Sequence, residues 1–224
     1  MVTSWKPEAS EARRGHLRVV RDDVSGLLAH DLKTPLAAIA MNLEFALGEL
    51  GPNAPASVRG ALEDCRDSNQ DAVVLVTDVV EALQLASGQR RPHLAPVDVQ
   101  GLLGAAVQRA SRGAAARGAT LVWTAEPTTI HGDVDLLERA LGRLLDRGLR
   151  YARAGGSLRV SLKQRTIAIR VVNPDGAVML LDSEVAAQSL ATHFADAVLR
   201  AQGGSLRTEL DADGAMVFVV SLPS

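Results

Sequence analysis

The sequence predicts an α+β fold in which a helical hairpin precedes an α/β sandwich. Two features of the apolar pattern carry this prediction. Through much of the first 87 residues, apolar side chains recur at alternating spacings of three and four, as in helices that pack side by side. After residue 92, short extended segments alternate with helical segments, as in domains whose helices cover a sheet. The 224 residues are enough for two small domains.

Three parts are expected along the chain: a flexible N-terminus at residues 1–11, a helical hairpin at 12–87 and a sandwich domain at 88–224. The first helix is expected from near Glu11 to Leu50, and a Gly-Pro-Asn-Ala-Pro turn at 51–55 ends it. A long apolar seam on this helix must be buried against partner helices. The seam consists of Leu32, Leu36, Ile39, Leu43, Ala46 and Leu50.

The second helix carries an apolar seam of the same kind. Two antiparallel amphipathic helices joined by a short loop leave part of their apolar surface uncovered, and a two-fold dimer covers it. We therefore expect a homodimer in which two hairpins form a four-helix bundle, with Asn69 on the seam placed to fix its register. The seam consists of Leu62, Cys65, Asn69, Ala72, Val76, Val79 and Leu83.

The sandwich domain begins after a break in the helical period at residues 88–92. Its pattern predicts helices gathered on one face of a mixed sheet. The predicted strands lie near 93–97, 120–124, 128–131, 157–163, 166–172, 205–210 and 215–222, and the predicted helices lie near 99–117, 134–150 and 187–202.

Composition and charge argue against several functional classes. The net charge of −2 provides no general attraction to nucleic acid or to an anionic membrane. Cys65 is the only cysteine, which excludes an internal disulfide and fits a reducing compartment. The sequence contains neither a run of about 18 apolar residues nor the apolar stretch of a signal peptide. We expect a cytoplasmic protein with no membrane span and no nucleic-acid partner.

The candidate reactive site is the heptapeptide His30 to Leu36, HDLKTPL, in the first helix. Residues four apart share a helix face, so His30 and Thr34 form one surface patch. His30 lies about 200° around the helix from the seam residue Leu32, so it should face solvent. A neutral imidazole is a good nucleophile near pH 7, and Asp31 can orient the ring and take its proton. This arrangement suggests a covalent phosphoryl acceptor, although a lone histidine on an amphipathic helix is more often an ordinary surface residue.

The heptapeptide resembles the phosphoacceptor box of the dimeric sensor histidine kinases, His-(Glu/Asp)-x-x-(Thr/Asn)-Pro-Leu, and matches it at every specified position. The second half resembles the family's ATP-binding domain at Val97 to Val99, His131 to Asp133 and Gly203 to Leu206. Sensor kinases usually carry a membrane span or an input domain ahead of the histidine helix. Because about thirty residues precede His30, we expect that this chain encodes no sensor.

The resemblance implies a site for Mg-ATP, but this sequence departs from the family there. The family holds the metal and nucleotide with an asparagine-rich helix, and arginines stand at both asparagine positions, Arg143 and Arg147. Mg²⁺ requires oxygen ligands, and a guanidinium has no lone pair to donate. The alternative that Arg143, Arg147 and Arg150 form a new clamp for phosphate or an acidic partner stays open.

The two remaining elements of the ATP site depart as well. Asn173 stands where the family has an adenine-reading aspartate, and Asp175 stands where it has glycine. Ser189 and Ala191 replace glycines that let backbone amides approach phosphates. The twelve residues 177–188, where the family has a mobile lid, are expected to form a short packed connector.

The expected function is therefore a histidine phosphotransferase of bacterial phosphorelays, built on a degenerate kinase scaffold. His30 carries a phosphoryl group to or from an aspartate of a response-regulator receiver domain, Asp31 positions the ring, and Thr34 orients a water or the acyl phosphate. We expect no bound ATP, cofactor or metal in this chain, with Mg²⁺ on the receiver and a separate sensor kinase as a further partner. The alternatives are a phosphatase or pseudokinase using Thr34, an atypical ATP-dependent histidine kinase, and a structural adaptor.

Overall fold

The computed structural model describes residues 8–51, 53–174 and 189–223, with side chains of the first helix described at Leu27 and from His30 onward. The chain divides into two compact units, Met1–Gln89 and Arg90–Ser224. Among the described residues, no helix combines the length and the apolar character that crossing a membrane requires.

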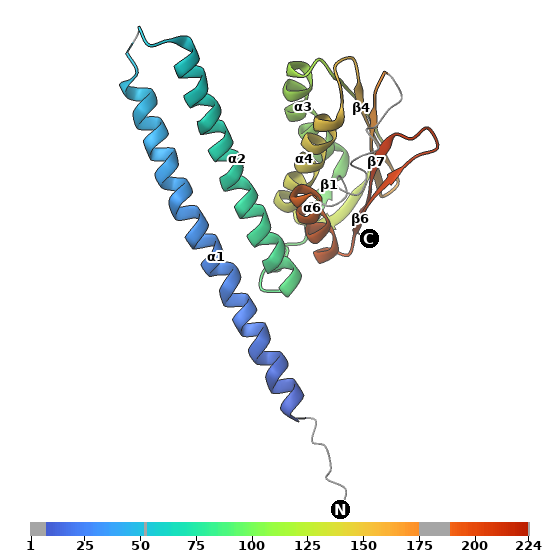
Figure 1. Ribbon diagram of the computed structural model, residues 1–224. Coiled ribbons are helices and arrows are strands. Elements are labelled where there is room, and N and C mark those ends of the chain that lie inside the picture. The colour runs from blue at the N-terminus through green and yellow to red at the C-terminus, as the bar shows by residue number, and fades with distance from the viewer. Residues whose placement is uncertain (1–7, 52, 175–188, 224) are drawn as a thin grey trace, which may run out of the picture. The chain divides into compact units, whose positions relative to one another are not determined.

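The first unit is an antiparallel helical hairpin of α1, Glu8–Glu49, and α2, Ala56–Ser87 (Figure 1). Helix α1 begins three residues before the start predicted near Glu11, and it continues through Pro35 as one helix. Helix α2 ends at Gly88, whose left-handed φ of 76° lets its amide donate to the Leu85 carbonyl. The prediction of a helical hairpin is confirmed.

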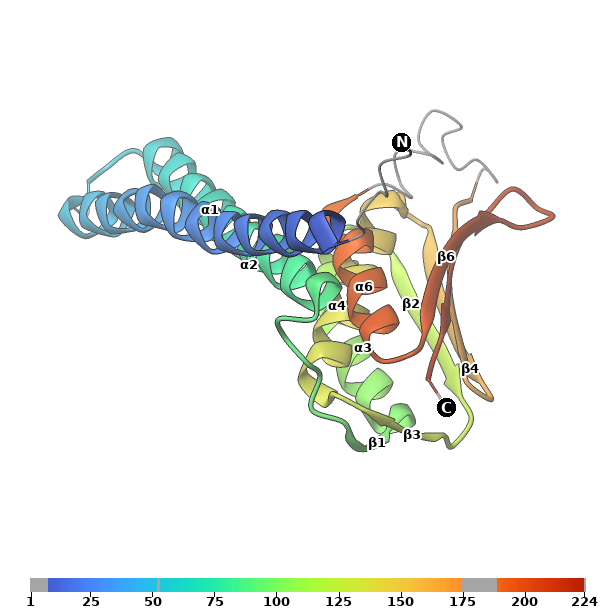
Figure 2. The same ribbon diagram turned by 90° about the horizontal axis from the view of Figure 1, so that it is seen from below.

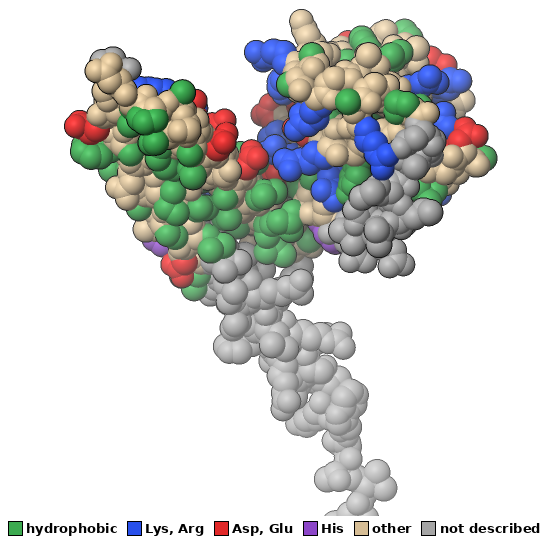
Figure 3. Space-filling model, turned by 45° about the horizontal axis from the view of Figure 1, so that its top comes forward, with side chains coloured by type: hydrophobic (Ala, Val, Ile, Leu, Met, Phe, Trp, Pro, Cys, Tyr) green, Lys and Arg blue, Asp and Glu red, His purple; other side chains and the backbone are tan. Residues whose placement is uncertain are grey.

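Much of the predicted apolar seam stays uncovered within a single hairpin. Leu32 and Ile39 are 42% and 46% exposed, whereas Leu36 and Leu43 are half-buried against α2. Cys65 is also exposed. Figure 3 shows apolar side chains gathered along the surface of the hairpin. An uncovered apolar surface of this kind on a helix pair is typical of a protein interface.

The second unit is built on a five-stranded mixed sheet of order β2-β4-β5-β7-β6, in which β2 is parallel to β4 and the other neighbours are antiparallel. A separate two-stranded ribbon pairs β1 with β3. The strands are β1 Ala95–Asp98, β2 Thr120–Ala125, β3 Thr129–Gly132, β4 Ser157–Lys163, β5 Thr166–Val172, β6 Ser205–Leu210 and β7 Met216–Ser221. The helices are α3 Val99–Ala116, α4 Val134–Tyr151 and α6 Leu190–Ala201.

The three helices cover one face of this sheet (Figure 2), which confirms the predicted sandwich. The core between them contains Phe194 and Phe218, both essentially inaccessible to solvent. Helix α4 approaches the sheet closely because Gly148 has no side chain: a Cβ there would lie 2.7 Å from a methyl carbon of Leu158. Strands β4, β5 and β6 have the bounds predicted from the sequence.

Asp133 joins three segments of the second unit. Its Oδ1 accepts a hydrogen bond from the Leu136 amide and so caps α4, while its Oδ2 accepts one from the His93 amide in the segment before β1. The Asp133 amide in turn donates to the side-chain oxygen of the buried Gln202, at the end of α6. The His-Gly-Asp segment is therefore a structural junction of this unit.

Candidate functional site

The predicted reactive turn lies on the solvent-facing side of α1. His30, Asp31 and Thr34 are all exposed, so the prediction that His30 faces solvent is confirmed for the single chain. The Thr34 hydroxyl donates a hydrogen bond to the His30 carbonyl oxygen at 2.9 Å. This bond fixes the hydroxyl beside the histidine and leaves its oxygen lone pairs able to accept a hydrogen bond from a water or a ligand.

Pro35 changes the backbone directly after this pair. Proline has no amide hydrogen, so the carbonyl of Asp31, four residues earlier, lacks its usual helical donor. The turn that carries the histidine therefore has fewer main-chain hydrogen bonds than a regular helical turn. The Thr34 hydroxyl adds a side-chain bond in this turn, but to the His30 carbonyl and not to the Asp31 carbonyl.

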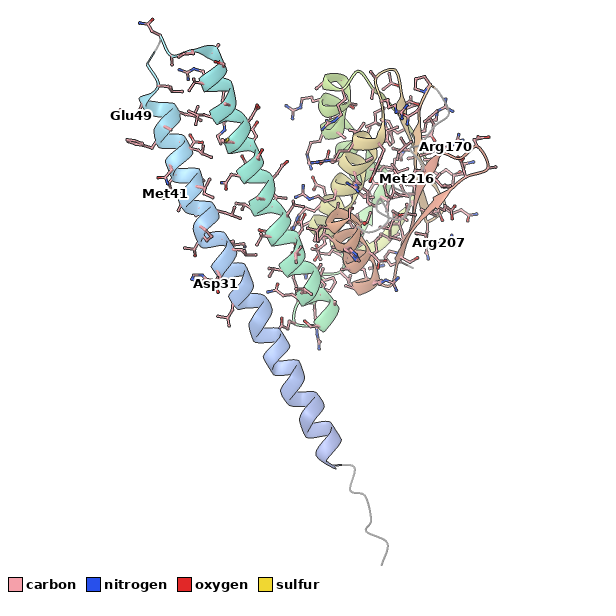
Figure 4. All side chains as sticks on the ribbon, in the orientation of Figure 1. Asp31, Met41, Glu49, Arg170, Arg207 and Met216 are labelled. Carbon is pink, nitrogen blue, oxygen red and sulfur yellow. The ribbon has the colours of Figure 1, made fainter. Side chains whose placement is uncertain are left out.

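Large exposed apolar side chains share the helix face of His30. Leu27, Met41 and Phe45 are 61%, 73% and 70% exposed. They precede His30 by three residues or follow it by 11 and 15, which places them within about 60° of it around the helix. Figure 4 shows Met41 on the side of α1 that faces away from α2. We call Leu27, His30, Thr34, Met41 and Phe45 the histidine face.

Met41 and Phe45 lie outside the predicted seam, so the apolar part of the histidine face was not predicted from the sequence. Their spacing of 11 and 15 residues from His30 was the available signal. Exposed apolar side chains beside a reactive group are typical of a docking surface for a macromolecule.

The residue at the predicted adenine-reading position, Asn173, is buried and bonded to backbone. Its Oδ1 accepts a hydrogen bond from the Arg153 amide at 2.9 Å, and its Nδ2 donates to the Tyr151 carbonyl at 3.2 Å. The side chain thereby ties the end of β5 to the last turn of α4 and to the segment that leads to β4. Both ends of the amide thus have backbone partners, which sequence reasoning did not foresee.

The N-terminus of α6, where the family has its glycine-rich phosphate contact, is closed by a capping box. The Ser189 hydroxyl accepts from the Thr192 amide at 3.2 Å, and the Thr192 hydroxyl accepts from the Ser189 amide at 3.1 Å. Ala191, the second residue of α6, is half-buried. Asp175, the remaining predicted position of this site, lies outside the described residues.

The two arginines of the predicted metal-binding helix, Arg143 and Arg147, are half-buried on α4. The Arg147 guanidinium stacks on the Tyr151 ring, with its carbon 4.8 Å from the ring centre. The Arg147 Nε is buried and finds no hydrogen-bond partner among the described residues. Neither guanidinium can ligate Mg²⁺, and the described residues contain no cluster of His, Cys, Asp and Glu side chains able to hold a metal ion.

No protein-family model matches the sequence. Individual proteins do. The chain is 31% identical over 194 residues to the signal transduction histidine-protein kinase BaeS of Escherichia coli. The aligned region covers 83% of this chain and 39% of BaeS. It is 28% identical over 151 residues to the adaptive-response sensory kinase SasA of Synechococcus sp. strain JA-2-3B'a(2-13). That aligned region covers 65% of this chain and 40% of SasA. The chain thus spans about two fifths of the length of these curated relatives.

Solved structures show the same likeness at the level of the fold. Full-length ShkA, crystallised in complex with AMPPNP, superposes with a TM-score of 0.66 over 90% of this chain and 45% of ShkA, at 20% identity. The sequence relatives and the shared fold together support the histidine kinase family as the one to which this chain is related.

Proposed function

We propose that this protein acts in two-component signalling as a histidine phosphotransferase, with His30 as the phosphoryl carrier. The observation that carries the proposal is a contrast within the chain. The phosphoacceptor turn is exposed and complete, whereas Asn173 and Ser189, at two of the predicted nucleotide positions, bond the backbone at the ends of elements in the sheet domain.

The proposed reaction is a reversible transfer between His30 and an aspartate of a receiver domain. A ring nitrogen of His30 attacks the phosphorus of the receiver's acyl phosphate, a P–N bond forms, and the P–O bond to the aspartate breaks, leaving a carboxylate. Asp31 stabilises the charge that develops on the imidazole. Mg²⁺ held by the receiver neutralises the phosphoryl oxygens, so this chain need supply no metal.

The histidine face supplies the docking surface for that receiver. Met41 and Phe45 lie along α1 from His30 and present apolar area to a partner. The exposed seam residues Leu32 and Ile39 point in other directions around the helix, and a second copy of the hairpin would cover them. We propose a homodimer through the hairpin, in which the histidine face remains open to the receiver.

Loss of ATP-dependent autophosphorylation is the finer part of the proposal. It is supported by the engagement of Asn173 with backbone, by the capping box at Ser189 and by arginines in place of metal-binding asparagines. An atypical ATP-dependent kinase is the second candidate, which the kinase names of the relatives favour. A phosphatase is the third, favoured by the fixed Thr34 hydroxyl, which is placed to orient a water.

The deciding experiment uses receiver domains charged with labelled acetyl phosphate. A carrier acquires label that is stable to base, labile to acid and located at His30 by mass spectrometry. A phosphatase instead releases inorganic phosphate, retains this activity in His30→Gln and loses it in Thr34→Ala. Labelling of His30 from Mg-ATP in the absence of any receiver would establish the kinase and overturn the finer proposal.

A further inference from the structure

Asn69 places a polar side chain between two apolar helices. It lies on α2, is 8% exposed, and donates from Nδ2 to the Leu36 carbonyl of α1 at 3.0 Å. Its Oδ1 is buried and finds no hydrogen-bond partner in the described part of the chain. Burial of a half-satisfied amide costs free energy that an apolar side chain of similar size would not cost. Packing alone therefore favours leucine at this position over asparagine.

The bond from Asn69 lies next to the gap that Pro35 leaves in the main-chain hydrogen bonds of α1. Leu36 directly follows Pro35, whose missing amide hydrogen deprives the Asp31 carbonyl of its helical donor. Thr34 bonds the His30 carbonyl at the beginning of this turn, and Asn69 bonds the Leu36 carbonyl at its end. Two side chains thus hold a segment in which the main-chain ladder is incomplete.

We propose that Asn69 is a positioning residue that fixes the direction in which His30 and Thr34 face. Its bond to the Leu36 carbonyl attaches α1 to α2 directly after Pro35. The helical turn before Pro35 carries His30 and Thr34. This inference rests on the proposed transfer function. It assigns to Asn69 control over the choice between two fates of the phosphoryl group: transfer to a correctly aligned receiver and loss to water.

Asn69→Leu separates this role from a purely structural one. The variant removes the amide, keeps the branching and the number of side-chain heavy atoms, and eliminates the unpaired Oδ1, so the thermal midpoint should stay equal or rise. The rate of phosphoryl exchange between His30 and a labelled receiver should nevertheless fall about tenfold, and the share of label lost to water should increase. Gln70→Leu, which also replaces a carboxamide by leucine but at the exposed neighbouring residue, is the matched control and should transfer within about twofold of the parent.

Two outcomes would overturn the inference. One is transfer by Asn69→Leu at the parent rate. The other is a fall in thermal midpoint that accompanies the fall in rate, because this would assign Asn69 to stability alone. Asn69→Asp, which keeps the shape but places a carboxylate against the Leu36 carbonyl, should be impaired in transfer at least as much as Asn69→Leu.

A second measurement does not depend on the proposed function. Amide hydrogen exchange of Ala37 to Ala40, followed by mass spectrometry without any receiver, should be several-fold faster in Asn69→Leu than in the parent and unchanged in Gln70→Leu. Unchanged exchange in Asn69→Leu would refute the coupling of Asn69 to the turn. Faster exchange in a protein that never accepts phosphate would instead uphold the coupling and refute the proposed transfer.

Discussion

The hairpin and the sheet domain use their polar side chains in opposite ways. On the hairpin, His30 and Thr34 are exposed, and the imidazole projects into solvent. In the sheet domain, Asn173 and Ser189 bond the backbone at the ends of neighbouring elements. A group that reacts with a partner protein must remain accessible, whereas a group that closes a helix end or a strand end must be enclosed. The same family resemblance therefore leads to different expectations in the two units.

Asn173 illustrates this difference at a single position of the sheet domain. Asn173 stands where the family has an adenine-reading residue, yet its amide joins β5 to the end of α4. The contacts described for this side chain are bonds to backbone.

His30→Gln should reduce phosphoryl exchange with a receiver to background, a loss of three orders of magnitude or more, because glutamine offers no nucleophilic ring nitrogen. The urea midpoint should hardly change, since an exposed side chain is replaced. His193→Gln, at an exposed histidine of α6, is the control and should exchange normally. Phosphoryl exchange by His30→Gln at the parent rate would show that His30 is not the phosphoryl carrier.

Asn173→Ala should destabilise the sheet domain by about 2 kcal/mol, because the Tyr151 carbonyl and the Arg153 amide both lose a buried partner. Urea unfolding followed by circular dichroism measures the change. Phosphoryl exchange at His30, measured well below the unfolding transition, should be retained.

Asn173→Asp sharpens the same prediction, because it installs the residue that the family carries. We expect lower stability and no gain of Mg-ATP binding by calorimetry, since the carboxylate keeps an acceptor for Arg153 but loses the donor to Tyr151. Tight Mg-ATP binding by this single variant would show that the nucleotide site is intact in its other parts.

Ser189→Ala should cost about 1 kcal/mol, the usual effect of removing an N-cap, and Ser189→Gly should cost only a few tenths. Neither change should raise the affinity for Mg-ATP. Ser111→Ala is a control within α3, where the hydroxyl bonds a helical carbonyl that already has an amide donor. An equal loss in this control would attribute the effect to general surface changes rather than to the cap.

Asp211→Asn should show the smallest effect, and one that depends on pH. Burial acts to raise the pKa of Asp211, but hydrogen bonds from Arg170 and from the Ala215 and Asp213 amides outweigh it and lower the pKa below its ordinary value of 3.8. The carboxylate therefore stabilises the fold above about pH 4, and this contribution disappears as the pH falls through the lowered pKa. The substitution should cost about 0.5–1 kcal/mol at pH 7 and progressively less below pH 4. A difference that persists unchanged to pH 2 would contradict this explanation.

The sequence predicted the fold in some detail because its signals are local. The period-two pattern of β4 and β5 and the heptad spacing of α1 and α2 depend on neighbouring residues, and so does the exposure of His30. The contacts of Asn173 were not predictable in this way. They join residues 20 and 22 positions apart. Nothing in the local pattern indicates that this amide will hydrogen-bond a helix end from the end of a strand.

The junction at Asp133 has a consequence for folding kinetics. Its bonds to His93 and Gln202 span 40 and 69 residues, so they can form only when distant parts of the unit have come together. We expect these polar bonds to form late, after the apolar core has brought the segments together. Asp133→Ala removes the side-chain bonds to His93 and to the Leu136 amide but keeps the bond from the backbone amide to Gln202. We therefore expect it to accelerate unfolding more than it slows refolding. In this sense, the junction sets how long the sheet domain stays folded more than how quickly it forms.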